Sequence, residues 1–420
     1  MISKRLYVTF PIAILVLEWI LVFYLHFNNP YHFITISKGT FSIIMLGLIC
    51  LLMGYLTAHS FYLNGKNDMP DVSQKIYVDQ RALGIFVLII SGIVLLGLLI
   101  SVQEIAKATN GFKLYFTNPF QARVRIVMLQ EGSIQNISKL NFKFGSYLTS
   151  LMFPLSILGG IAIAQKSRWR FTGLFPLILV IIYSLLYLNR FGLITSLGLW
   201  FFTLIYYSIY LPENERKTLL KKIALYAVLA IVFVSLFFYL ILSIRAFYIS
   251  DIGYYIKRSF YAYFAGSPAA FEKLLNEPQP LMYGASSFRS VVKWFGRLGL
   301  VETGQYLGAH NAFKNISLGS PMTMNTFTFV KTLYEDFGIL GVAFITTIWG
   351  ALARYFIEKG FQKFSLLNLF IIAVFVLSFL MTFYEFFFQG ITMFIYWSFV
   401  LVAFGRYFET KGIITYVKYA

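Results

Sequence analysis

Residues 83–102 read LGIFVLIISGIVLLGLLISV, a run of twenty residues that contains no charged side chain. About 20 consecutive apolar residues match the length that an α-helix needs to cross a bilayer. A helix is required there because lipid offers no hydrogen-bond partner to a bare backbone amide. The stretch therefore predicts a transmembrane helix.

Comparable runs recur along the chain and predict about ten spans in all, at 7–27, 40–60, 83–102, 145–165, 171–189, 191–211, 223–243, 334–356, 365–385 and 389–408. Hydrophobic residues make up 59% of the chain and charged residues only 12%, whereas soluble domains carry about 25% charged residues. We expect an all-α polytopic transmembrane protein in which residues 1–420 form a single integral membrane domain. The first run is too long for a signal peptide and lacks a small-residue cleavage site, so we interpret it as a retained helix.

The distribution of cations orients these spans, because Lys and Arg accumulate in short cytoplasmic loops. One face collects the cations of the short loops and the termini: Lys4, Arg5, Lys66, Lys75, Arg81, Lys166, Arg168, Arg170, Arg216, Lys217, Lys221, Lys222, Arg354, Lys359, Lys363, Arg406, Lys411 and Lys418. This face is predicted to be cytoplasmic and to hold both termini. Two large outer loops, 103–144 and 244–333, then lie on the opposite face and are expected to contain short interfacial helices. Helical spacing over 112–130 indicates one of these helices.

Cations also populate the two outer loops, and the formal net charge is +18. They are spread over many loops without a nucleic-acid-binding module, so we exclude a nucleic-acid partner. A basic outer surface fits an anionic substrate, because the arginine fork binds phosphate through two parallel hydrogen bonds. Cys50 stands alone in an apolar span and no metal-binding or ATP-binding motif occurs, so the sequence predicts no metal site and no cofactor.

Arg190 is the most unusual of these cations, because the spans 171–189 and 191–211 leave almost no loop around it. A charge at such a depth costs several kcal/mol unless it is paired or hydrated, and it marks a functional site by default. The alternative is an interfacial arginine whose side chain extends to the lipid headgroups. The same two interpretations apply to Arg245, which follows the seventh span. Further candidates in the outer loops are Arg123, Arg125 and Arg289.

Carboxylates and one histidine supply candidate acid–base groups. Glu335 and Asp336 open the eighth span, where they either favour the helix dipole or act as a general base or an arginine partner. His310, in the second outer loop, is a weaker candidate for the base. Glu18 lies within the first span, where we expect a structural partner, whereas Glu385 lies near the outer end of the ninth span and is the better site candidate.

Two neighbouring stretches carry a family resemblance. Residues 321–329 read PMTMNTFTF and residues 333–341 read LYEDFGILG. They resemble the signature of bacterial oligosaccharide repeat-unit polymerases, the O-antigen polymerase family, in which an Asn-x-Tyr/Phe-Thr stretch precedes a Tyr-x-Asp-Phe-Gly-x-x-Gly helix start. The stretches YFAGSP (263–268) and LMYG (281–284) are similar to further points of the same outer loop.

The resemblance implies a membrane glycosyltransferase on the outer face of the bacterial inner membrane. Such enzymes join oligosaccharide repeat units linked to undecaprenyl pyrophosphate, for O-antigen, capsule or exopolysaccharide synthesis. No cofactor is implied, because the energy lies in the sugar–pyrophosphate bond. The expected partners are the lipid-linked oligosaccharide, membrane lipid, a chain-length regulator and a flippase.

The chemistry of this reaction suggests a role for each candidate residue. The assignments are Arg190, Arg245 and Arg289 for the departing pyrophosphate, Arg123 and Arg125 for the second lipid-linked unit, Asp336, Glu335 or His310 for the base, and Asn325 and Tyr334 for the sugar. The resemblance covers only residues 325–341 of this set; the arginines are assigned by their location.

Three other functions stay open at this point. A glycan ligase would use the same lipid-linked donor and differ in its acceptor, and residues 325–341 favour the polymerase over it. A transporter or flippase for the same glycolipid is less favoured, because no internal repeat is visible and the charges gather at the outer ends of spans. A structural subunit of an export complex would not require Arg190 at its depth.

Overall fold

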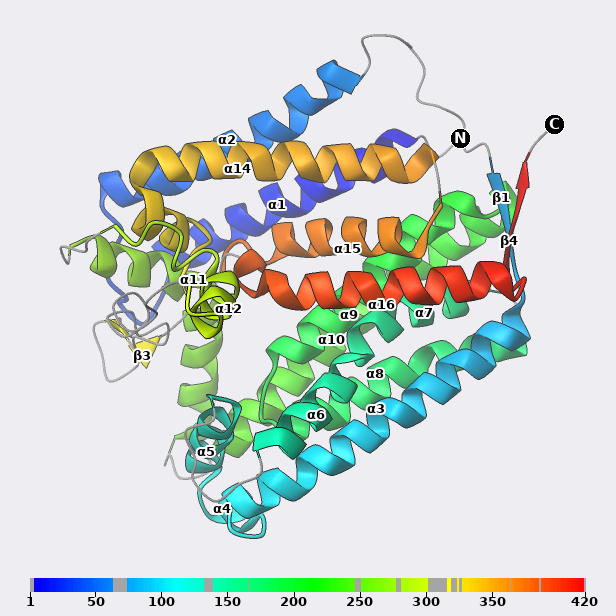
Figure 1. Cartoon of the computed structure of the whole chain (residues 1–420). Coiled ribbons are helices and arrows are strands. Elements are labelled where there is room, and N and C mark those ends of the chain that lie inside the picture. The colour runs from blue at the N-terminus through cyan, green and yellow to red at the C-terminus, as the bar shows by residue number, and fades with distance from the viewer. Residues whose placement is uncertain are drawn as a thin grey trace. The chain divides into compact units, whose positions relative to one another are not determined.

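The computed structural model describes residues 4–62, 74–131, 139–165, 167–245, 251–276, 281–300, 316–318, 323–324, 327–362, 364–384 and 387–418 (Figure 1). The helices are α1 (Lys4–Phe27), α2 (Lys38–Tyr62), α3 (Gln80–Ala108), α4 (Lys113–Thr117), α5 (Pro119–Glu131), α6 (Lys139–Ser150), α7 (Met152–Ala164), α8 (Phe175–Leu186), α9 (Phe191–Tyr207), α10 (Glu213–Arg245), α11 (Ile252–Leu275), α12 (Arg289–Arg297), α14 (Val330–Gln362), α15 (Leu366–Leu380) and α16 (Ile391–Thr410). Short 3-10 helices are η1 (Arg168–Leu174), η2 (Ser208–Tyr210) and η3 (Phe387–Gly390), and the strands are β1 (Gln74–Val78), β2 (Ile316–Ser317), β3 (Thr323–Met324) and β4 (Ile414–Lys418).

Nine helices within the described residues are long and apolar enough to cross a membrane, so the chain is a multi-pass membrane protein. They cover Leu6–Phe27, Lys38–Ala58, Gln80–Ala108, Leu140–Ala164, Arg168–Leu186, Phe191–Tyr210, Glu213–Ile244, Val330–Gly360 and Ile391–Thr410. The ninth predicted span, 365–385, is the shorter helix α15 of 15 residues. At about 1.5 Å per residue α15 is shorter than the roughly 30 Å of hydrocarbon in a bilayer.

Three elements differ from the sequence expectation. The predicted span 145–165 is two helices, α6 and α7, which meet at Leu151. Helix α10 begins at Glu213, ten residues before the predicted 223, because its polar first turns are good helix formers that hydropathy does not register. Helix α11, 24 residues long, lies wholly within the stretch that we expected to be an outer loop.

The chain divides into two compact units. The first comprises Met1–Asp71, Lys257–Gln362 and Val374–Tyr396, and the second comprises Val72–Ile256, Lys363–Ala373 and Trp397–Ala420. In the first unit α2 and α14 pack against each other at a close crossing (Figure 1). Glycines make this approach possible: a Cβ on Gly54 would lie 2.0 Å from the Thr347 carbonyl oxygen, and one on Gly350 would lie 2.0 Å from the Leu51 carbonyl oxygen. Small residues at a helix crossing let two backbones touch, which is a main source of helix association in membranes.

Replacing Gly350 with alanine is expected to destabilise the protein by about 1–3 kcal/mol, because the new methyl group must push the backbone of α2 away. The measurement is thermal unfolding of the purified protein in detergent. Gly92→Ala on α3 is the matched control, since nothing lies within 4 Å of a Cβ built there. Equal unfolding midpoints for the two variants would contradict the close crossing.

A half-buried glutamate, Glu18, ties α1 to the turn after α15 within the first unit. Glu18 Oε1 accepts hydrogen bonds from the Thr382 hydroxyl and from the Phe383 amide, both at 3.1 Å. The Trp19 indole N–H donates to the same Thr382 hydroxyl at 2.9 Å. Glu18 therefore supplies the acceptor for the Phe383 amide in the turn that follows α15.

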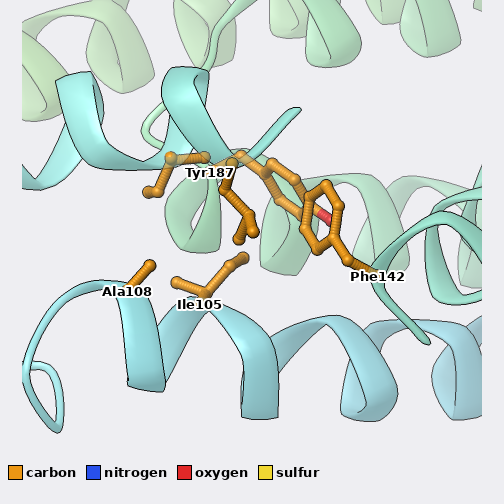
Figure 2. Close-up of a cluster of buried hydrophobic side chains, with 6 residues drawn as sticks. Ile105, Ala108, Phe142 and Tyr187 are labelled. Atoms are coloured by element: carbon orange, nitrogen blue, oxygen red, sulfur yellow. The ribbon is translucent and has the colours of Figure 1, made fainter. Parts of the chain in front are cut away.

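The second unit has an aromatic cluster where α3 approaches the turn after α8. Buried Ile105 and Ala108 of α3 face Phe142 of α6 and Tyr187 (Figure 2), and Ile126 and Leu129 of α5 complete the cluster. The predicted segment 112–130 is therefore helical, as α4 and α5, and its apolar side chains are shared between this core and the surface. Val124 and Met128 of α5 remain exposed.

Two short strands join distant parts of the second unit. β1 pairs with β4 in antiparallel fashion, with Gln74 opposite Lys418 and Val78 opposite Ile414. The Asp79 carboxylate then caps α3 by accepting the amides of Arg81 and Ala82 at 3.0 and 3.1 Å. Strand pairing between these segments was not predicted, because neither has a periodic apolar pattern long enough to signal a strand.

Candidate functional site

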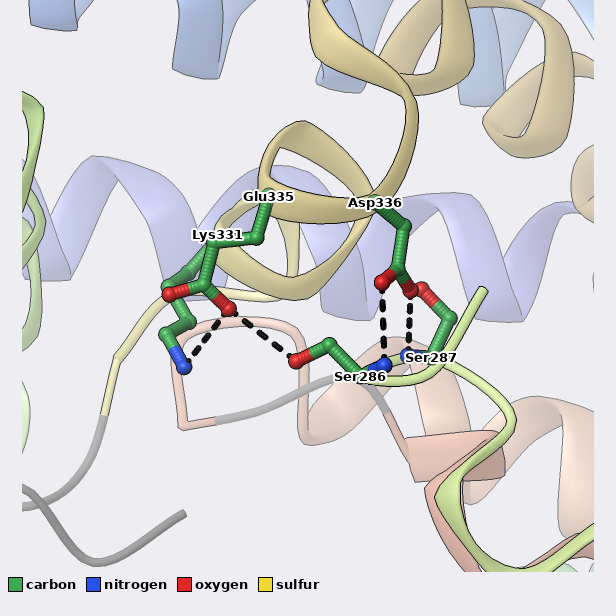
Figure 3. Close-up of polar contacts among 5 residues, drawn as sticks. All are labelled: Ser286, Ser287, Lys331, Glu335 and Asp336. Carbon is green, nitrogen blue, oxygen red and sulfur yellow. Dashed lines mark hydrogen bonds and ion pairs between the residues drawn. The ribbon is translucent and has the colours of Figure 1, made fainter. Parts of the chain in front are cut away.

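The first turns of α14 carry two adjacent buried carboxylates. Asp336 is fully buried and Glu335 is 3% exposed. Asp336 Oδ1 accepts the Ser286 amide at 2.9 Å and Oδ2 accepts the Ser287 amide at 2.5 Å (Figure 3). Both oxygens of one carboxylate thus hold two consecutive amides of a segment that lies fifty residues earlier. A carboxylate that accepts backbone amides makes strong, charge-assisted hydrogen bonds.

A break in α14 directly after Asp336 completes this attachment. Gly338 has φ 65° and ψ −158°, a conformation outside the helical region. Past such a break, the carbonyls of Glu335 and Asp336 lose their usual helical donors. They accept the amides of Met282 and Tyr283 instead, at 2.9 and 3.1 Å. We call the contacts of Glu335 and Asp336 with residues 282–287 the carboxylate clamp.

The charge of Glu335 is balanced by a lysine of the same helix. Its Oε2 forms an ion pair with Lys331 Nζ at 2.8 Å and accepts the Ser286 hydroxyl at 3.0 Å (Figure 3). Lys331 is 6% exposed and lies one helical turn before Glu335. Because burial of an unpaired carboxylate is costly, the lysine stabilises the charged form of Glu335.

The clamp fixes the start of the next helix. Helix α12 begins at Arg289, two residues after Ser287, so the attachment of Ser286 and Ser287 sets the direction in which Arg289 leaves the clamp. Tyr334, also on α14, packs its half-buried ring edge-on against Phe271 of α11 at 6.0 Å. Three predicted site residues, Glu335, Asp336 and Arg289, are thus brought into one neighbourhood.

Replacing Gly338 with alanine is expected to destabilise the clamp by about 1–3 kcal/mol, since this φ/ψ region is populated almost only by glycine. Nothing lies within 4 Å of a Cβ built at Gly338, so the cost is conformational and not steric. Thermal unfolding of the variant in detergent measures it. Gly405→Ala on α16 has equal space and a helical backbone, and should be neutral or slightly stabilising. A Gly338 variant as stable as that control would rule out the strained break.

Arg190 is buried in the second unit, at 7% exposure. It lies at the start of α9, after the short turn that follows α8, and its guanidinium stands over the Phe238 ring of α10 at 4.7 Å. The Asn189 side chain accepts the Phe191 amide at 3.1 Å and helps to close the turn. The stack places the positive charge of Arg190 against the aromatic face of Phe238.

Arg123 reaches the same turn from α5. Its Nη1 donates to the Tyr187 carbonyl oxygen at 3.0 Å, and the Tyr115 hydroxyl of α4 donates to the Leu186 carbonyl oxygen. The two contacts attach α4 and α5 to the turn that carries Arg190. Burial raises the pKa of Tyr115 above its ordinary value, so this donor keeps its proton at all physiological pH values.

The remaining predicted site residues are distributed as follows. Arg125 is exposed on α5. Arg245 ends α10, and nothing is described of its side chain. His310, Asn325 and Glu385 lie outside the described residues. Within the described part of the chain, no group of three or more His, Cys, Asp or Glu side chains is arranged to hold a metal ion.

Sequence reasoning missed Ser286 and Ser287 of the clamp, and it missed Lys331, the ion-pair partner of Glu335. Lys331 was detectable, because it stands four residues before Glu335, the spacing of a helical ion pair. Ser286 and Ser287 were not, because they contribute mainly backbone amides, which every residue but proline offers. In comparisons with protein-family models, with curated proteins and with solved structures, no match to this chain was found.

Proposed function

We propose that this membrane protein is a glycosyltransferase that polymerises lipid-linked oligosaccharide repeat units on the outer face of the bacterial inner membrane. The observation that carries the proposal is the carboxylate clamp. It is built from Glu335, Asp336 and the Gly338 break, the residues that carry the resemblance to repeat-unit polymerases. Within the clamp, the two carboxylates and the glycine each have a structural role, because together they hold residues 282–287 against the start of α14.

The proposed reaction transfers a growing glycan from one lipid carrier to the next repeat unit. A hydroxyl oxygen of the incoming lipid-linked unit attacks the anomeric carbon at the reducing end of the growing chain. The carbon–oxygen bond to undecaprenyl pyrophosphate breaks, and the pyrophosphate leaves with the bonding electron pair. The hydroxyl proton passes to a carboxylate or imidazole base and then to water. Arginines stabilise the charge that develops on the leaving group.

The geometry refines the proposed roles. Both oxygens of Asp336 already hold backbone amides, so its first task is to fix residues 286–287 and the start of α12. Glu335, His310 and Asp336 stay candidates for the base. The proposed pyrophosphate ligands stay Arg190, Arg245 and Arg289. Arg190 is buried and stacked on Phe238, and Arg289 starts the helix that follows the clamp. Arg123 is engaged with the Tyr187 carbonyl and so acts on the second repeat unit through the α4–α5 segment.

We place both termini in the cytoplasm and count α15 as a tenth, shortened crossing. The pairing of β1 with β4 supports this topology, because it puts residues 74–78 beside the C-terminal strand, and both were assigned to one face by their cations. The alternative count of nine crossings would put the two ends of the chain on opposite faces.

The test is the length distribution of the surface glycan in a strain that lacks the gene, with and without complementation. A collapse to single repeat units that the wild-type gene reverses would support the polymerase. Long polymer that accumulates on the lipid carrier would identify a ligase instead. Repeat units trapped on the cytoplasmic leaflet would identify a flippase, and unchanged polymer would exclude all three.

A further inference from the structure

Arg258 is a buried cation on α11 for which the described residues provide no hydrogen-bond acceptor at Nε or Nη2. The side chain is 7% exposed. Its Nε and Nη2 atoms are inaccessible to solvent and have no hydrogen-bond acceptor in the part of the chain that the structure describes. The neighbouring Ser259, 1% exposed, likewise has a buried hydroxyl with no partner there.

Two other buried cations of the same unit have carboxylate partners. Lys331 pairs with Glu335 at 2.8 Å and Arg354 pairs with Glu358 at 2.5 Å, each with the carboxylate four residues later on the same helix. The positions three and four residues from Arg258 hold three tyrosines and an alanine, namely Tyr254, Tyr255, Tyr261 and Ala262. Helix α11 therefore offers Arg258 no carboxylate at the spacings that form helical ion pairs.

Arginine stays charged in proteins, so the side chain cannot relieve this situation by becoming neutral. A buried charge without a counter-charge is strongly unfavourable. An external anion that accepts hydrogen bonds from Arg258 would supply the missing counter-charge.

The two atoms without acceptors define the shape of that anion. Nε and Nη2 lie along one edge of the planar guanidinium group, and their N–H bonds point the same way. This edge binds two oxygens of one phosphate or carboxylate group through two parallel hydrogen bonds. In a multi-pass membrane protein, the abundant anions at hand are the phosphates of lipids.

We propose that Arg258 binds the phosphate or diphosphate group of a lipid through its Nε–Nη2 edge. The identification of that lipid as the lipid-linked repeat unit rests on the proposed function, whereas the phosphate site itself does not. Arg258 then joins Arg289 of the same unit as a ligand of the transferred substrate.

The test uses the full-length protein purified in an uncharged detergent and its thermal unfolding midpoint. The probes are inorganic pyrophosphate, inorganic phosphate and acetate at equal ionic strength, and nanodiscs of phosphatidylglycerol against phosphatidylcholine. The variants are Arg258→Met and, as a matched control, Arg354→Met. Pyrophosphate is expected to raise the wild-type midpoint. Arg258→Met is expected to raise the pyrophosphate concentration that gives half of this effect by about tenfold or more.

The ligand-free proteins give a second, independent signature. Arg258→Met removes a buried charge that has no partner among the described residues, so its midpoint should equal or exceed that of wild type. Arg354→Met leaves Glu358 buried without its partner and should lower the midpoint strongly. A comparable loss in both variants would overturn the proposal, since it would reveal a protein partner for Arg258.

Each remaining outcome also decides. An Arg258-dependent rise only in phosphatidylglycerol nanodiscs supports the site and identifies a lipid headgroup as its ligand. An equal effect of acetate overturns the phosphate class, and the absence of any Arg258-dependent rise overturns the site. The binding measurements do not depend on polymer formation, so they test the phosphate site even if the protein is not a polymerase. An Arg258-dependent pyrophosphate site in a strain with unchanged glycan length would support the site and refute only its link to polymerisation.

Discussion

Asp336→Ala is expected to lower the free energy of unfolding by about 3 kcal/mol and to abolish polymer formation. The variant leaves the buried amides of Ser286 and Ser287 without acceptors, and each hydrogen bond to a charged group contributes about 1.5–3 kcal/mol. Release of residues 286–287 also frees the start of α12 and with it Arg289. Thermal unfolding in detergent and glycan length in the complemented deletion strain measure the two effects.

A second carboxylate with the same number of amide partners serves as the control. Asp79 accepts the amides of Arg81 and Ala82 at the start of α3, but it is exposed, so water can replace it. Asp79→Ala should therefore cost only about 1 kcal/mol. If Asp336→Ala unfolds at the wild-type temperature and still loses polymer, Asp336 acts as a base and the clamp contributes nothing to stability. If polymer is retained as well, the residue has neither role.

Arg190→Ala is expected to reduce polymerisation by about a hundredfold, the typical loss when one donor to a developing negative charge is removed. The glycan should collapse toward single repeat units at equal expression of the protein. Arg190→Lys should recover only part of the activity, because an ammonium group keeps the charge but loses the planar stack on Phe238 and the bidentate edge.

Arg170 offers a matched comparison in the same unit. Its guanidinium also stands over an aromatic ring, that of Phe171 at 4.9 Å, but the side chain is exposed. Arg170→Ala should leave the glycan length unchanged. Full activity of Arg190→Ala, or an equal loss in the two variants, would show that the buried position of Arg190 has no part in the reaction.

Hydropathy predicted the long helices well because each apolar run must bury its own backbone hydrogen bonds in lipid. The run 83–102 became the centre of α3, which extends from Gln80 to Ala108. The same criterion failed for α11, since that helix mixes polar and apolar side chains and its burial comes from protein neighbours. It also gave no sign of the break at Leu151, because the residues on both sides are apolar.

The candidate site was accessible to sequence reasoning only in part. Adjacent Glu335 and Asp336 at a helix start were visible, and so was the glycine that interrupts α14. Their main partners are backbone groups: the amides of Ser286 and Ser287 for Asp336, and in the other unit the Tyr187 carbonyl for Arg123. Backbone groups are the same in every residue, so such contacts leave no pattern in the sequence.

The β1–β4 pair imposes an order on the biogenesis of the protein. β1 is made soon after α2, whereas its partner consists of residues 414–418. At synthesis rates of about 5–20 residues per second, β1 waits roughly twenty seconds to a minute for β4. All the helices from α3 to α16 are synthesised during that delay, and β1 meanwhile offers an open strand edge. Completion of the second unit therefore waits until residues 414–418 have been synthesised.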